Sequence, residues 1–308
     1  MGLRLSRFRP ASFKILGLLV ILTMGFSPAL VQAATSPSAS SQGAGSACAA
    51  GYGFTPDGCA LLSCIHQVGD GASVRTQPDG SSVVTYADGS EQTFAPCAVG
   101  FSPQFQTNGW VEDAESVQST HKMTGNWTVP AAPSSNDRQL VYMFIGTQHC
   151  VCSSADIVQP VIQWGYGSAN GGGPFWGFAS WYVTSSGSFF VSRLKDINAG
   201  DELAGLIKQT GSSCGNSCSW IIKGTDATLG TSTTLKVAGL DKQADDFVTL
   251  EVYNLARCSD YPASGSTAFT RLLVNSHTVS GWSLNVLQND GCHEQVTSSN
   301  PSTVSLFY

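Results

Sequence analysis

Short runs of β-branched and aromatic residues recur from about residue 101 to the end of the chain, separated by Gly, Asn, Asp and Ser. No window keeps a 3.6-residue hydrophobic period over three turns, so long amphipathic helices are not expected. The runs predict strands at 125–130, 139–146, 158–164, 175–184, 188–193, 203–209, 219–223, 233–237, 247–253, 268–275 and 303–308. This pattern of many short strands is typical of an all-β antiparallel sandwich or barrel.

Two polar residues interrupt apolar strands. Gln159 lies in the apolar run 157–163, and Glu251 alternates with Phe247 and Tyr253, which places these three side chains on one strand face. A carboxylate in such a strand either points to solvent or lies in a lined groove, and the pattern alone favours solvent.

The chain holds only six glutamates, which narrows the choice of a functional carboxylate. Glu112 and Glu115 fall in a polar stretch that reads as a loop. Glu91 falls in the N-terminal region, and Glu202 and Glu294 fall in predicted turns or loops. Glu251 is therefore the only glutamate predicted to lie in the middle of a strand.

The N-terminus has the pattern of a secretory signal. Residues 1–33 begin with four basic residues, continue with an apolar run and end in Val31-Gln-Ala33. Its removal leaves 15 − 4 = 11 basic and 21 acidic residues, a net charge of −10. We expect a secreted, extracellular protein with a low-complexity linker at 34–45, a small Cys-rich module or propeptide at 46–100, and the main β domain at 101–308.

Ten cysteines follow the predicted signal. An even number in an oxidising compartment favours disulfides over a zinc site, since no paired CxxC motifs are present. Cys214 and Cys218 are predicted to close a hairpin tip, and the sequence leaves the other pairings open.

Composition and missing motifs exclude several classes. Only 12% of residues are charged and the balance is acidic, unlike a nucleic-acid-binding protein. No GxSxG, HExxH or phosphate-binding loop is present, and none of the five histidines lies in a catalytic motif. The sequence predicts neither a metal nor a cofactor.

Seven segments, in order, resemble the eqolisins, the glutamic peptidases of the scytalidoglutamic type (peptidase family A4, G1). They are Gly125–Pro130 (GNWTVP), Phe144–Gln148 (FIGTQ), Val158–Gln163 (VQPVIQ), Phe178–Val183 (FASWYV), Ile197–Leu203 (INAGDEL), Leu250–Leu255 (LEVYNL) and Leu272–Ser276 (LLVNS). Several carboxylates of the family pattern are replaced here: Gln148, Gln163, Ser180 and Leu255 stand at such positions.

The resemblance implies a concanavalin-like, two-sheet β-sandwich and a secreted, acid-acting, metal-independent endopeptidase. In this implied mechanism Glu251 activates water and returns its proton to the leaving amine, while the amide of Gln159 stabilises the oxyanion. The implied substrate-binding residues are Trp164, Trp181, Tyr182, Gln163 and Gln148.

The implied partners are polypeptide substrates. We expect no binding to nucleic acid, no attachment to a membrane once the signal is removed, and a monomeric protein. Two alternatives remain open: a secreted carbohydrate-binding sandwich module, whose exposed aromatic side chains would stack on sugars, and a catalytically inactive peptidase homologue.

Overall fold

The computed structural model describes residues 48–56, 58–97, 109–150, 156–211 and 217–308. The predicted signal and linker, and Cys214 of the predicted hairpin staple, lie outside these residues. Within the described residues the chain forms two large sheets, one small hairpin and two 3₁₀ turns.

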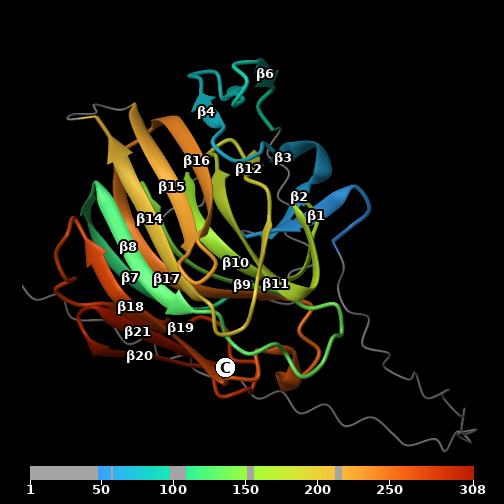
Figure 1. The fold of residues 1–308 in the computed structure, drawn as a ribbon, viewed down its shortest axis with the longest axis vertical. Helices are drawn as coiled ribbons and strands as arrows, with labels where there is room; N and C mark the ends of the chain where they lie inside the picture. The colour runs from blue at the N-terminus through green and yellow to red at the C-terminus, as the bar shows by residue number, and fades with distance from the viewer. Residues whose placement is uncertain (1–47, 57, 98–108, 151–155, 212–216) are drawn as a thin grey trace, which may run out of the picture. The chain divides into compact units, whose positions relative to one another are not determined.

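Two large β-sheets make up the fold (Figure 1). The nine-stranded sheet has the order β19 (Ser283–Val286), β7 (Gly109–Thr120), β17 (Gln243–Tyr253), β9 (Leu140–Gln148), β10 (Ile157–Gly167), β11 (Gly171–Val183), β12 (Phe189–Val191) and β3 (Ile65–Gln67), and β13 (Lys195–Ile197) pairs with β11. The ten-stranded sheet has the order β20 (Gln295–Asn300), β21 (Thr303–Phe307), β18 (Ser266–Val274), β8 (Lys122–Thr128), β14 (Glu202–Thr210), β15 (Cys218–Asp226), β16 (Thr231–Leu240), β4 (Ser73–Thr76), β5 (Ser82–Thr85) and β6 (Glu91–Phe94).

The remaining elements are small. A two-stranded hairpin is formed by β1 (Tyr52–Thr55) and β2 (Gly58–Leu61), and two single-turn 3₁₀ helices, η1 and η2, cover Leu62–Cys64 and Cys258–Asp260. All eleven predicted strands are present, which confirms the all-β sandwich. In the described part of the chain no helix is long and apolar enough to cross a membrane.

The main hydrophobic core lies between the two large sheets. Ile145 of β9 and Pro160 of β10 reach toward Gly205 of β14, which leaves space for them because a Cβ there would come within 3.0 Å of both side chains. Gly125 of β8 makes the same kind of close approach to Ile145. The side chains of β9 and β10 that alternate with Ile145 and Pro160 therefore point away from the ten-stranded sheet.

This second side of the nine-stranded sheet, which we call the outer face, carries its own buried cluster. It comprises Leu140, Tyr142, Phe144, Ile157, Val161, Ala179, Trp181, Val183, Phe189, Val191, Phe247 and Tyr253, together with Ala60 of the β1–β2 hairpin. The hairpin lies on this face: the rings of Phe54 and Tyr253 are 5.0 Å apart. The hairpin therefore contributes to the burial of this face.

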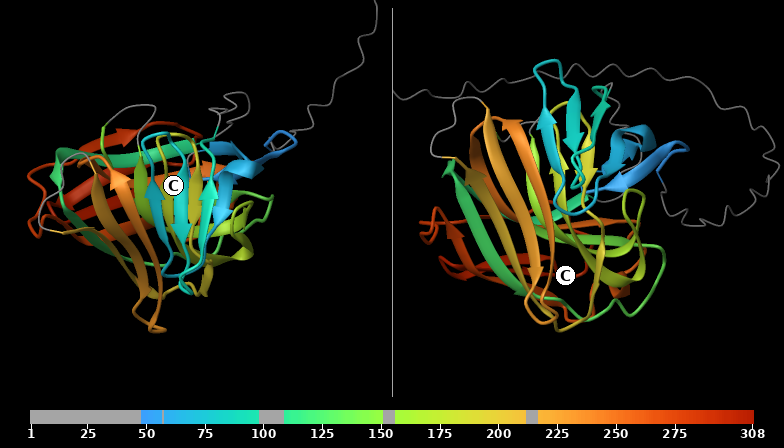
Figure 2. Two further views of the ribbon diagram at one scale, coloured as in Figure 1. Left: turned by 90° about the horizontal axis from the view of Figure 1, so that it is seen from above. Right: turned by 45° about the horizontal axis from the view of Figure 1, so that its top comes forward.

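The N-terminal region joins both sheets (Figure 2). Strand β3 pairs in parallel with β12, and β4 pairs in parallel with β16. Disulfides Cys48–Cys59 and Cys64–Cys97 hold this region together. The described residues between 48 and 97 thus extend the two sheets, while the predicted domain boundaries stay a prediction.

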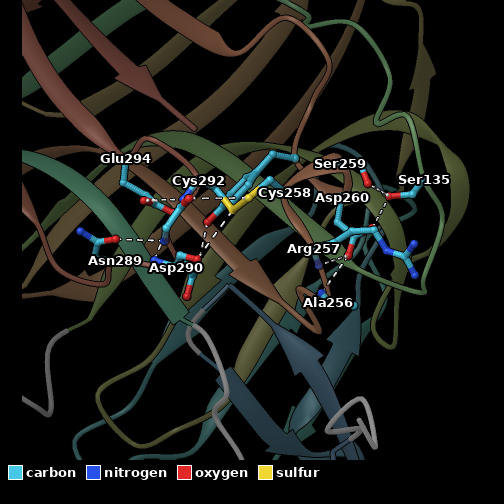
Figure 3. Close-up of a disulfide and its surroundings, with 12 residues drawn as sticks. Ser135, Ala256, Arg257, Cys258, Ser259, Asp260, Asn289, Asp290, Cys292 and Glu294 are labelled. Atoms are coloured by element: carbon cyan, nitrogen blue, oxygen red, sulfur yellow. Dashed lines mark hydrogen bonds between the residues drawn. A yellow bond between two sulfur atoms is a disulfide. The ribbon is translucent and has the colours of Figure 1, made fainter. Parts of the chain in front are cut away.

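A third disulfide, Cys258–Cys292, lies near the end of β17 (Figure 3). It joins η2, a few residues after β17, to the loop before β20. The Asp260 carboxylate accepts hydrogen bonds from the main-chain N–H groups of Ala256 and Arg257, at 2.8 and 3.1 Å, and from the Ser135 hydroxyl. These contacts fix the loop that follows the strand carrying Glu251.

One sequence expectation was wrong. Glu112 and Glu115 do not lie in a loop but in the 12-residue strand β7, between β17 and β19. Glu112 is fully buried, so Glu251 is not the only glutamate inside a strand. The strand was missed because its carboxylates suggested solvent, whereas neighbouring strands bury them.

Candidate functional site on the outer face

Glu251 lies on the outer face and is fully buried. On the adjacent strand β9 its partner is Tyr142, and the Tyr253 hydroxyl donates a hydrogen bond to its carboxylate. Burial, with the nearby charge of Glu251, raises the pKa of the Tyr142 phenol well above its usual value. The carboxylate is thus held in an aromatic environment, contrary to the solvent position that the pattern alone favoured.

Gln159 lies on the same face, on β10, and is also fully buried. Its Nε2 donates a hydrogen bond of 3.4 Å to the main-chain carbonyl of Pro56, which follows β1. The amide of Gln159 therefore already binds a peptide carbonyl, and that carbonyl belongs to the chain's own N-terminal hairpin.

The strand register does not place Gln159 opposite Glu251. The pairs of β10 with β9 on either side of Gln159 keep one register, which puts Gln159 opposite Gly146, and Gly146 in turn pairs with Phe247 of β17. Glu251 pairs instead with Tyr142, four residues along β9. At about 3.3 Å per residue, this offset is about 13 Å along the strands.

The position of β17 that lies level with Gln159 is occupied by an aromatic ring. A Cβ added to Gly146 would lie 2.1 Å from a ring carbon of Phe247, so the ring covers this glycine. Phe247 also packs on Trp110, with ring centroids 4.9 Å apart. The surface between Gln159 and β17 is therefore apolar, because the Phe247 ring covers it.

The five predicted substrate-binding residues divide between the two faces. Trp181, Gln163 and Gln148 lie on the outer face: Trp181 pairs with Gln159, Gln163 pairs with Tyr142, and Gln148 pairs with Ile157. Gln163 donates hydrogen bonds to the carbonyls of Gly165 and Gly171, at 2.9 and 2.8 Å. The structure thus brings these three together with Glu251 and Gln159 on one face.

Trp164 and Tyr182 are on the opposite side of the sheet. Both belong to the core between the sheets. Trp164 packs edge-on against Trp176, with centroids 5.5 Å apart, and the Tyr182 hydroxyl lies 2.7 Å from the hydroxyl of Thr76. These two side chains support the sandwich and do not reach the outer face.

The outer face also carries a group of acids that the sequence did not predict to lie there. Asp113 and Glu115 of β7 pair with Thr249 and Phe247, so they share the face of Glu251, and Asp245 is a third acid on β17. Burial raises the pKa of Asp113 to about 6 and that of Glu115 to about 7, and neighbouring carboxylates contribute to both shifts. The period-2 pattern of 245–251 could have identified Asp245, since it alternates in phase with Glu251.

Several buried polar atoms of this face have no hydrogen-bond partner within the described residues. They are Gln159 Oε1, Tyr142 Oη, Trp181 Nε1, Thr249 Oγ1 and Asp245 Oδ1. Buried polar atoms are nearly always satisfied in proteins, and exceptions often mark functional positions. On the outer face they are groups that could bind the polar atoms of a ligand.

A hollow of about 400 Å³ opens next to the hairpin. Phe54, whose ring lies against Tyr253, forms part of its wall. Tyr166, Arg138 and Asn254 also line it. Phe54 thus borders both the hollow and Tyr253, the residue whose hydroxyl bonds to Glu251.

No group of three or more His, Cys, Asp or Glu side chains in the described residues is arranged to hold a metal ion. The arrangement offers amides that can bind carbonyl groups and carboxylates that can accept protons.

Comparison with known proteins finds similarity in fold. Scytalido-glutamic peptidase bound to a transition-state analogue inhibitor is 16% identical, with a TM-score of 0.46 over 66% of this chain and 99% of that one. SCP-B, an eqolisin in complex with the tripeptide Ala-Ile-His, is 17% identical, with a TM-score of 0.45 over the same shares. No protein family profile and no curated protein sequence matches the chain.

Proposed function

We propose that the protein is a secreted, acid-acting, metal-independent endopeptidase that cleaves polypeptides on the outer face. One observation carries the proposal: the Gln159 amide donates to the peptide carbonyl of Pro56, in the turn of the β1–β2 hairpin that lies on this face. An amide that binds a carbonyl oxygen can stabilise the oxyanion formed when water attacks that carbonyl.

The chemistry needs one further group, a carboxylate that takes a proton from water and returns it to the leaving amine. Strand β17 offers Asp245 and Glu251 on this face. Glu251 is the residue that the sequence analysis predicted for this role. The three disulfides between described cysteines suit an extracellular protein, and we propose a monomer.

In this proposal the β1–β2 hairpin limits access to the site. Phe54 packs on Tyr253 while the Pro56 carbonyl occupies Gln159. Loosening the hairpin is therefore expected to expose the amide to substrate.

The test uses the mature chain and denatured protein substrate between pH 2 and pH 7, with a chelator present throughout. Wild type is compared with Gln159→Ala and Phe54→Ser. We expect cleavage in acid, a loss of a hundred-fold or more in Gln159→Ala, which corresponds to about 3 kcal/mol, and faster cleavage by Phe54→Ser. Equal cleavage by Gln159→Ala and wild type would contradict the proposal.

A second candidate function is non-catalytic polypeptide binding by an inactive homologue. The observation that favours it is the Phe247 ring at the position level with Gln159. Absence of cleavage by every form, together with retained binding of an extended peptide by Phe54→Ser, would favour this candidate.

A further inference from the structure

Two carboxylates of β17, Asp245 and Glu251, share the outer face with Gln159. The strand register places them at different distances from Gln159. Gln159 lies level with Gly146, and Asp245 pairs with Gln148, only two residues from that glycine. Glu251 pairs with Tyr142, four residues away on the other side.

These registers translate into distances. One intervening strand puts β17 about 10 Å from β10, and the offsets along the strands are about 7 Å for Asp245 and about 13 Å for Glu251. The Cα atoms of Gln159 and Asp245 are therefore about 12 Å apart, against about 16 Å for Glu251. Two extended side chains and one water span the shorter separation more easily.

The contacts of the two acids differ as well. Glu251 accepts a hydrogen bond from Tyr253, at the end of the face where Phe54 packs. Asp245 Oδ2 accepts a hydrogen bond of 2.6 Å from Gln148 Nε2, and Gln148 lies on β9, the strand between Asp245 and Gln159.

The second oxygen of Asp245 is the more informative atom. Asp245 is 1% exposed, and its Oδ1 has no hydrogen-bond partner in the described part of the chain. A buried carboxylate oxygen without a donor is unfavourable, and a water bound there would satisfy it. Gln148 thus orients the carboxylate while its other oxygen stays available for water.

The electrostatic surroundings suit a proton acceptor. Burial raises the pKa of the Asp245 carboxyl group, and the bond from Gln148 opposes that rise. On β7, the neighbouring acids are Asp113 and Glu115; on β17 itself, Asp246 faces the other side and bonds to Thr120. A general base works best when its pKa is near the working pH, so a raised value favours moderately acidic conditions.

We propose that Asp245, positioned by Gln148, is the carboxylate that activates water against a carbonyl bound by Gln159. This inference rests on the peptidase function proposed above and changes the identity of its base. The Asp245 carboxylate removes a proton from water, and the water oxygen bonds to the carbonyl carbon, whose oxygen takes the electron pair beside the Gln159 amide. Collapse of this intermediate breaks the C–N bond, and the proton held by Asp245 passes to the leaving amine.

The experiment compares full-length mature wild type with Asp245→Asn and Glu251→Gln, a matched pair of uncharged, nearly isosteric changes on one strand and one face. We expect Asp245→Asn to lower kcat/KM by a hundred-fold or more, a larger loss than that caused by Glu251→Gln. Unchanged melting temperatures would show that both variants fold.

Two further variants keep the test decisive if Asp245→Asn unfolds. Asp245→Glu retains a carboxyl group and should retain measurable activity with a shifted pH profile. Gln148→Ala, at a positioning residue, should lower kcat with little change in KM and move the acidic limb of the profile.

The outcomes separate the two proposals. Activity lost in Glu251→Gln but kept in Asp245→Asn overturns the role of Asp245 and leaves the peptidase function standing. Activity kept in both variants but lost in Gln159→Ala also overturns it. Absence of cleavage by wild type and every variant overturns both proposals.

Discussion

The buried carboxyl group of Glu112 makes a quantitative prediction about stability and pH. Glu112 pairs with Leu250 and faces the core between the sheets, where it is fully buried. Burial raises its pKa from 4.5 to about 8, and the nearby charge of Glu294 adds to the rise. In the folded protein this side chain is therefore neutral in acid and across most of the neutral range.

The direction of the pH effect follows from linkage. A carboxyl group whose folded pKa is raised contributes its full stability below its unfolded pKa, and that contribution is lost as pH rises through the folded pKa. In the unfolded chain the pKa of Glu112 is 4.5, which is 2.5 pH units below pH 7, so the carboxyl group is ionised there. In the folded chain it is still mostly neutral at pH 7. At 1.36 kcal/mol per unit, the free energy of unfolding falls by about 3 kcal/mol between acid and pH 7.

Glu112→Gln removes this titration with almost no change of shape. We compare the free energies of unfolding of variant and wild type, and expect their difference to shift in favour of the variant by about 3 kcal/mol from pH 4 to pH 7. This corresponds to roughly 6 to 12 °C in melting temperature. Chemical denaturation and calorimetry at the two pH values measure the difference. The matched control is Glu91→Gln, at an exposed position on β6.

Asp113, Glu115 and Asp246 also have raised pKa values, so both proteins should lose some stability toward neutral pH. The contribution of Glu112 is therefore given by the difference in the free energy of unfolding between Glu112→Gln and wild type. If both proteins showed the same dependence on pH, the buried, neutral state assigned to Glu112 would be refuted.

Two further predictions concern packing and covalent restraint. Gly146→Ala should destabilise the fold by about 1 to 3 kcal/mol, because its Cβ would meet the Phe247 ring. The double variant with Phe247→Ala should lose less stability than the sum of the two single changes. Strict additivity of the free energies in a denaturation cycle would contradict this contact. Replacing Cys258 and Cys292 by Ser opens a loop with a sequence separation of 34 and should lower the free energy of unfolding by about 4 kcal/mol; an unchanged denaturation midpoint would show that the bridge does not restrain the unfolded chain.

Much of the fold could be predicted from local sequence. Strands rich in β-branched and aromatic residues, such as β17 around Phe247, follow from composition and period-2 alternation. Turns such as the one at Gly80, where φ is +81°, follow from Asp-Gly pairs that tolerate this backbone conformation. Strand β7 could not be predicted in this way, because its acids, Glu112 among them, are buried by strands distant in the sequence.

The candidate site shows the same division. Alternation along one strand determined that Glu251 shares a face with Phe247, because side chains on a strand alternate with a period of two. Which residues lie level across strands β10, β9 and β17 was decided only by the tertiary structure, since register depends on pairing between segments far apart in the chain. Sequence thus supplied the residues of the outer face. The assembled sheet placed Phe247 level with Gln159 across β9, Asp245 two residues from that level and Glu251 four residues from it.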